Sequence, residues 1–346
     1  MKHYFVLIFS MVVLMTSCKS PELKLKTAKV YKKISQHETL KNRTENKVYY
    51  IRGIKNIFSY GKDTLIVIPE SDRVFYVTNN NLEVIDVIDF KNIEYMVNPP
   101  IMGVAMLNKE IYFIDITFKL KKYNIAAKKV TIMPFRNRGN NILAVYDEAN
   151  TYTTETNPEY PTYVIKNERP IKDEQKILLG IKSKGVDIRG NPIYTDISEY
   201  GSTEYTKYEV VYVQVQNSKI YFTFRLSRKV LIYDLNGYFI ESKILLVDDD
   251  YYKPPEMQHA NGRKTLVFSE INAQPLCYSD GYLTQLYRTK SGNEPSIVCY
   301  NDKIEPVCRY IIQNNNKSGE AYIRLYWICN KRLYTTNGMN GITIYE

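Results

Sequence analysis

Histidine is nearly absent from this chain of 346 residues, which contains only His3, His37 and His259. Because histidine supplies many general bases and zinc ligands, its scarcity argues against both kinds of site. The motifs HExxH, CxxC and GxSxG are missing, and Gly262-Arg263-Lys264-Thr265 lacks the spacing of a phosphate loop. Asp248-Asp249-Asp250 lacks the alternating spacing of a calcium loop. We therefore expect no metal, no cofactor and no catalytic residue from a known motif.

Cysteine is also scarce, and four of the five cysteines lie in the last quarter of the chain: Cys277, Cys299, Cys308 and Cys329. A two-residue turn between Cys299 and Cys308 would set them roughly 13 Å apart along a sheet, too far for a disulfide. A four-residue loop, Asp302 to Glu305, would set them directly opposite, within bridging range. Both registers stay open, and buried thiols between sheets are favoured over a disulfide.

Long hydrophobic runs are missing except for Tyr4 to Met15, twelve uncharged residues that follow Lys2 and His3. This run is too short to cross a hydrocarbon core of ~30 Å and is typical of a signal peptide. The residues Leu14-Met15-Thr16-Ser17-Cys18 resemble the lipobox of bacterial lipoproteins. The resemblance implies cleavage after residue 17 and acylation of Cys18, by palmitate among other chains. The alternative is an uncleaved anchor with an incidental cysteine.

The residues after Cys18 bear on which membrane holds the protein. Lys19 stands where an Asp is the usual signal for retention in the inner membrane, so we expect the outer membrane. The acidic cluster of surface-exported lipoproteins is reduced to Glu22. We therefore expect the protein to face the periplasm, with the cell surface as the alternative.

The formal net charge of +10 is unevenly distributed. Residues 19–47 hold nine Lys or Arg and three Glu, a net of +6, so the rest carries little excess charge. A body without concentrated basic charge argues against nucleic-acid binding. We expect residues 18–46 to be a lipidated basic tether beside anionic lipid, either a solvated linker or a short interfacial helix. Residues 47–346 would form one domain.

A repeated pair of strands organises this domain, and six copies are expected. In four of them an aromatic strand precedes a second strand by ten to twelve residues: Val74–Thr78 before Leu82–Asp86, Ile111–Asp115 before Leu120–Asn124, Ile220–Thr223 before Val230–Asp234, and Arg332–Thr335 before Gly341–Tyr345. Polar turns at Asn108-Lys109 and Asn217-Ser218 join upstream apolar strands to two of these units. Weaker copies begin at Ile142 and Leu266. Antiparallel meanders repeated at about 40 residues predict an all-β, six-bladed β-propeller of four-stranded blades.

Residues 47–54 are expected to pair with residues 341–346 and close the ring, because an open ring would leave strand edges free. The run Val230-Leu231-Ile232-Tyr233-Asp234-Leu235-Asn236-Gly237-Tyr238 is a strand, a turn and a return strand. In these features the chain resembles the six-bladed β-propeller lipoproteins of Bacteroidetes, a TolB-like and NHL-like group. The resemblance implies a fold and no particular activity.

Tyrosine is abundant, with 32 residues, and several lie in two long spacers, residues 171–208 and 246–264. We expect ligand binding by four of these: Tyr205, Tyr208, Tyr251 and Tyr252. Packing of the loops is the alternative for these rings. The favoured function is a non-catalytic binding or scaffold lipoprotein that engages an envelope protein or glycan through its loop rim. The alternative is a polysaccharide-acting lyase or hydrolase that uses Tyr, Arg and carboxylate groups at the axial channel.

Overall fold

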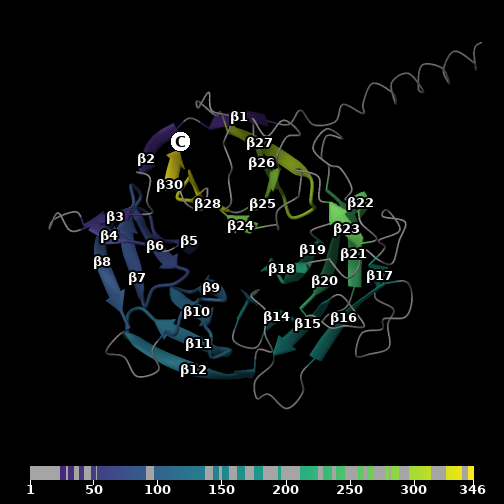
Figure 1. Cartoon of the computed structure of the whole chain (residues 1–346), viewed down its shortest axis with the longest axis horizontal. Coiled ribbons are helices and arrows are strands. Elements are labelled where there is room, and N and C mark those ends of the chain that lie inside the picture. The colour runs from purple at the N-terminus through teal and green to yellow at the C-terminus, as the bar shows by residue number, and fades with distance from the viewer. Residues whose placement is uncertain are drawn as a thin grey trace, which may run out of the picture.

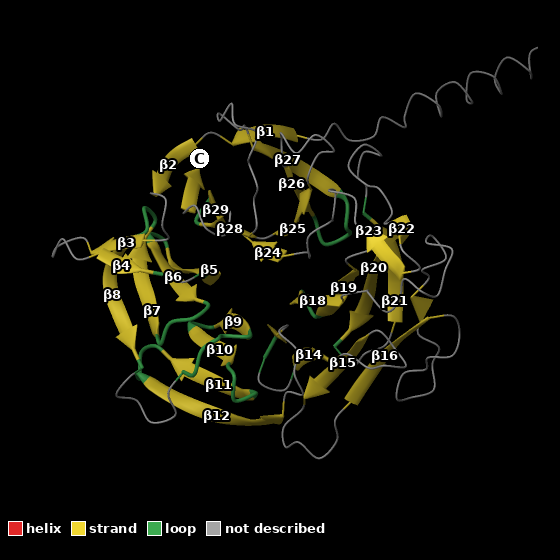
Figure 2. Cartoon of the chain, in the orientation of Figure 1, coloured by secondary structure: helices red, strands yellow, loops and turns green. Residues whose placement is uncertain are grey.

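A computed structural model describes the backbone of twenty-one segments of the chain, and side chains in most of them. These segments are residues 24–28, 30–34, 39–42, 48–51, 53–90, 97–136, 143–147, 150–155, 162–167, 175–181, 194–195, 211–224, 229–235, 239–245, 256–260, 263–267, 277–279, 282–287, 296–312, 325–336 and 342–346. Every regular element within them is a β-strand (Figure 2). The predicted all-β class is therefore confirmed for the described residues.

Five sheets, here called the first to fifth blades, each contain four consecutive antiparallel strands. The first blade has β5 (Ile54–Gly61), β6 (Thr64–Pro69), β7 (Val74–Asn79) and β8 (Glu83–Asp89). The second has β9 (Gly103–Leu107), β10 (Glu110–Ile114), β11 (Lys119–Asn124) and β12 (Lys129–Arg136). The third has β13 (Leu143–Val145), β14 (Thr151–Glu155), β15 (Thr162–Asn167) and β16 (Gln175–Ile181), to which the short β17 (Tyr194–Thr195) adds in parallel. The fourth has β18 (Val211–Gln216), β19 (Lys219–Phe224), β20 (Lys229–Asp234) and β21 (Phe239–Ile244). The fifth has β24 (Cys277–Ser279), β25 (Tyr282–Tyr287), β26 (Ser296–Tyr300) and β27 (Pro306–Ile312).

The remaining strands do not form a sixth blade of this kind. Among the described residues, three consecutive strands follow the fifth blade, and we call them the closing sheet: β28 (Leu325–Cys329), β29 (Arg332–Thr336) and β30 (Ile342–Tyr345). A separate two-stranded sheet, β22 (Glu256–Ala260) with β23 (Arg263–Val267), lies between the fourth and fifth blades in the chain. The prediction of six equivalent four-stranded blades is therefore wrong, because five sheets contain four consecutive strands, whereas the closing sheet reaches four strands only with β2 (Val30–Ile34) from the N-terminal segment.

The sheets are arranged in a ring around a common centre, as in a β-propeller (Figure 1). The first strand of each sheet, such as β5, β9 and β18, lies innermost, and β8, β12 and β21 lie toward the outside (Figure 1). Each sheet buries its two faces against the neighbouring sheets, as the repeat requires. A cluster of large side chains, including Phe75, Phe90 and Phe113, fills the space between the first and second blades.

The N-terminal segment supplies additional strands at the outer edges of three sheets. β1 (Lys24–Ala28) pairs in parallel with β27, and β2 (Val30–Ile34) pairs antiparallel with β30. β3 (Thr39–Asn42) pairs in parallel with β8, and β4 (Val48–Tyr50) pairs with β3. The sheets therefore extend to the N-terminal side of residue 47, and residues 24–28 and 30–34 are strands rather than a linker or an interfacial helix.

The closure of the ring also differs from the expectation. β30 pairs with β2, not with residues 47–54, and β5 is the innermost strand of the first blade. The prediction was wrong because β7 was matched to the second strand of the other units, whereas it is the third strand of its sheet. This mismatch left β5 without a place in the repeat, so the preceding residues 47–54, which include β4, were expected to close the ring.

Tight turns between the first and second strands fix the register of three sheets. Both central residues have positive φ at Asn108-Lys109, at Asn217-Ser218 and at Asn330-Lys331. This is the type I′ geometry that matches the twist of a two-residue hairpin, and Asn adopts it more easily than most residues. The first two turns were predicted from the sequence and are confirmed.

Candidate functional site

The structure does not describe the residues expected to carry function. Cys18, Tyr205, Tyr208, Tyr251 and Tyr252 all lie outside the described residues. Their positions in the chain are nevertheless bounded by described strands. Tyr205 and Tyr208 fall between β17 and β18, and Tyr251 and Tyr252 fall between β21 and β22.

The strand order determines the face of the ring from which the chain leaves β16, within the first long spacer, and β21, before the second. In each blade the fourth strand ends, and the first strand of the next blade begins, at the same face, which we call the connection face. Since the strands alternate in direction, the turn between the second and third strands of each blade lies there too. The opposite face, which we call the turn face, carries the turns between first and second strands and between third and fourth strands. The spacers after β16 and β21 therefore leave from the connection face.

Asp115, which directly follows β10 and is fully buried, organises a described turn of the connection face. One carboxylate oxygen, Oδ2, accepts from the backbone N–H of Asn98 at 2.8 Å and from Lys121 Nζ at 2.5 Å. The other, Oδ1, accepts from the backbone N–H of Thr117 at 3.0 Å and from its hydroxyl at 2.5 Å. Four donors thus satisfy a carboxylate that burial would otherwise destabilise.

The buried ion pair of Asp115 and Lys121 ties two parts of the chain together. The side chains of Lys121 and Asp115 are 3% and 0% exposed, and Asn98 belongs to the connection between the first and second blades. The backbone N–H of Ile116 also donates to Asn98 O at 3.2 Å. The turn between β10 and β11 is therefore held against the connection that enters its own blade.

Two large apolar side chains project from this fixed turn. Ile116 is 52% exposed and Phe118 is 40% exposed, and we call this pair the apolar tip. Phe118 has a φ of 56° and its N–H donates to Asp115 O at 2.9 Å, which closes the turn. A bulky residue at positive φ is uncommon and carries strain. The turn thus holds two apolar groups in solvent although its backbone would suit a smaller residue.

The apolar tip was not recognised from the sequence. The residues Ile111 to Asp115 and Leu120 to Asn124 were correctly placed in strands, and the four residues between them were treated as a connection. The signal available was an Asp at the end of a strand, followed two residues later by a Thr that it caps. The apolar identity of Ile116 and Phe118 within so short a turn was a second signal.

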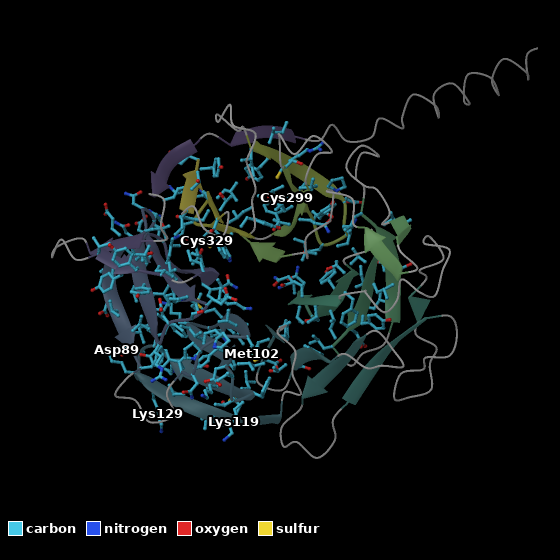
Figure 3. All side chains as sticks on the ribbon, in the orientation of Figure 1. Asp89, Met102, Lys119, Lys129, Cys299 and Cys329 are labelled. Carbon is cyan, nitrogen blue, oxygen red and sulfur yellow. The ribbon has the colours of Figure 1, made fainter. Side chains whose placement is uncertain are left out.

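The pairing of Cys299 with Cys308 follows one of the two registers predicted from the sequence. Cys299 of β26 lies directly opposite Cys308 of β27, and both are buried thiols, as is Cys329. A register shift after Cys299 pairs Tyr300 with Pro306, so the loop is one residue longer than the four expected. Cys299 and Cys329 lie in neighbouring sheets (Figure 3). Cys277 lies on β24, where only its backbone is described.

Within the described ranges, no group of three or more His, Cys, Asp or Glu side chains is arranged to hold a metal ion. The same residues include no helix long and apolar enough to cross a bilayer.

The pKa of Tyr221 is raised to about 12, chiefly by burial and then by the charges of Asp302 and Glu241. This tyrosine lies between the fourth and fifth blades, away from the apolar tip.

No protein-family profile and no curated protein matches the sequence. Among solved structures, BamB from Moraxella catarrhalis is 8% identical, with a TM-score of 0.43, and the match covers 93% of this chain and 98% of that chain. An exported protein from Bacteroides fragilis is 12% identical, with a TM-score of 0.48, and the match covers 93% of this chain and 99% of that chain. The propeller assignment rests on the strand order and pairing of this chain itself.

Proposed function

We propose that this chain is an envelope lipoprotein, acylated at Cys18, whose propeller binds a protein or glycan without chemical conversion. The binding surface is the connection face, and it includes the apolar tip. The spacers that carry Tyr205, Tyr208, Tyr251 and Tyr252 leave from the same face. The outer membrane is the proposed site, with the propeller on the periplasmic side.

The observation that carries this proposal is the apolar tip. A monomer gains nothing from exposing Ile116 and Phe118, since each fully buried side chain of this size stabilises a fold by ~1.5–3 kcal/mol. The turn instead uses four hydrogen bonds to Asp115, one of which is the buried ion pair with Lys121, to keep them in place. Loops on a rigid scaffold are where binding residues usually lie, and apolar anchors within a polar rim dominate binding energy.

The test is capture of a ligand by variants of the apolar tip. Ile116→Ser combined with Phe118→Asn should leave the melting temperature nearly unchanged, because both side chains are exposed and Asn tolerates positive φ. Binding to a glycan array, or to a crosslinked partner from envelope extracts, should weaken by about tenfold or more. The matched control is Ile240→Ser, which removes an exposed isoleucine near the start of β21, toward the turn face and away from the connection face.

Undiminished binding by the tip variant would exclude the apolar tip from the binding surface. Tyr251→Ala combined with Tyr252→Ala then tests the spacer on the same face. Adjacent residues of an extended segment point to opposite sides, so we expect at least one of these rings to be available to a ligand. Equal loss of binding in the β21 control would mean that capture reports general surface apolarity rather than a site.

A further inference from the structure

The strand pairing of β1 determines where the chain from Cys18 reaches the propeller. Lys24 lies opposite Cys308, near the start of β27, and the two strands run in parallel. β27 is the fourth strand of its blade, so it starts at the turn face, beside the turn between β26 and β27. β1 lies at the outer edge of the ring (Figure 1). The chain therefore joins the propeller at the turn face and at its rim.

The length of the preceding segment limits how far this point can be from lipid. Five residues separate Cys18 from Lys24, and six extended Cα–Cα steps span at most about 20 Å. An acylated Cys18 lies at the membrane surface, so the start of β1 is held within that distance. The turn between β26 and β27, at the turn face, lies beside this point, because Lys24 is opposite Cys308 near the start of β27.

Charge at the turn face fits anionic lipid head groups. Five lysines in its turns are exposed: Lys62, Lys109, Lys128, Lys303 and Lys331. Three exposed carboxylates in these turns, Asp63, Asp302 and Glu305, accompany them, as does Glu346 directly after β30. The sequence of residues 19–34, which leads into β1 and β2, adds six Lys and one Glu, a net of +5. Each cation near an anionic bilayer adds ~1 kcal/mol of attraction, so the net positive charge favours contact with anionic lipid.

From this placement we infer that the turn face, beginning at β1 and the turn between β26 and β27, lies against an anionic membrane surface. The connection face with the apolar tip then points away from the lipid, toward the aqueous compartment. This inference rests on the proposed acylation of Cys18 and deepens it, because it assigns which face of the propeller is available to a ligand.

The experiment measures the reactivity of lysine amines in the acylated full-length protein reconstituted on vesicles. Vesicles of phosphatidylcholine alone are compared with vesicles that also contain phosphatidylglycerol. The acyl chains hold the protein on both, so only the charge of the head groups changes. Lys109 and Lys119 form a matched pair in the second blade, exposed at the turn face and at the connection face respectively. Mass spectrometry of modified peptides reports each amine.

We expect Lys109 and Lys303 to react about threefold or more slowly on the anionic vesicles, and Lys119 to be unchanged. An equal change at Lys109 and Lys119, or a greater change at Lys119, would overturn the orientation. The mass of the N-terminal peptide separates this outcome from failure of the proposed function. A peptide without acyl chains refutes the anchor itself, whereas an acylated peptide with the wrong lysine pattern refutes only the orientation.

Discussion

Tyrosine hydroxyls join neighbouring sheets at equivalent places around the ring. Tyr152 of β14 donates to Leu235 O in the fourth blade at 2.8 Å, and Tyr334 of β29 donates to Asn80 O in the first blade at 2.9 Å. Tyr221 occupies the corresponding strand of the fourth blade, but its buried hydroxyl has no hydrogen-bond partner among the described residues. The same residue type thus contributes differently at different blade boundaries.

Phenylalanine substitutions should separate these roles. Tyr152→Phe leaves the carbonyl of Leu235 without its donor and should lower the free energy of unfolding by about 1 kcal/mol. Tyr221→Phe removes a hydroxyl that lacks a partner and should change stability by less than about 0.5 kcal/mol. Urea denaturation of both variants checks the difference, and equal losses would contradict it.

The raised pKa of Tyr221 adds a pH dependence of known sign. In the unfolded chain the phenol ionises near pH 10.0, and in the fold its pKa is about 12. Its neutral form therefore contributes fully below pH 10, and this contribution is lost as the pH rises toward 12. The difference in unfolding free energy between wild type and Tyr221→Phe should shift in favour of the variant across that interval.

Loss of the ion pair between Lys121 and Asp115 should destabilise the protein far more than loss of the pair between Lys122 and Glu110. Lys121→Met leaves a buried carboxylate without its cation and should destabilise the protein by about 3 kcal/mol. Lys122→Met is the matched control, because Lys122 Nζ lies 3.4 Å from Glu110 in a partly exposed pair. The control should cost less than about 1 kcal/mol, and comparable losses in the two variants would contradict the assignment.

At the scale of elements, the N-terminal strands complete sheets that consecutive strands leave open. β2 covers β30, β1 covers β27 and β3 covers part of β8. Uncovered strand edges invite pairing with other chains. The strands from residues 24–42 therefore belong to the fold, although they come from a segment whose lysines made it look like a tether.

Truncation tests this role of β1 and β2. A chain that begins at Leu23 keeps both strands, and one that begins at Ser35 loses them. We expect the shorter chain to melt about 10 °C lower, because the closing sheet retains only β28 to β30. Light scattering should also show self-association through the exposed edge of β30. Equal melting temperatures would mean that β1 and β2 add nothing to the ring.

For the whole molecule, the proposed attachment to lipid depends on acylation of one residue, Cys18. Cys18→Ala should abolish incorporation of radiolabelled fatty acid and release the protein from the membrane fraction, because one or more acyl chains supply the anchor. A high-salt wash excludes binding through the basic N-terminal segment alone. Persistence of Cys18→Ala in the washed membranes would refute the lipobox interpretation.

Local patterns in the sequence predicted much of the fold. Three kinds of pattern depend on only a few neighbouring residues: alternating apolar residues, recurrent aromatic strands and turns that begin with Asn. They could therefore be recognised in the sequence without knowledge of the strand pairing. The predicted aromatic strands include Tyr112, Tyr221 and Tyr334, and all three tyrosines are buried. The sequence also showed the absence of standard catalytic motifs.

Only the tertiary structure decided which distant strands meet. The pairing of β1 with β27 joins residues far apart in the chain, and no local pattern distinguishes a strand at a sheet edge from a basic linker. The register that sets Cys299 opposite Cys308 depends on a bulge that composition does not reveal. The exposure of Ile116 and Phe118 follows from the packing around Asp115, Lys121 and Asn98. Sequence thus determined the strands and turns, whereas the edges, the faces and the apolar tip depend on contacts between residues far apart in the chain.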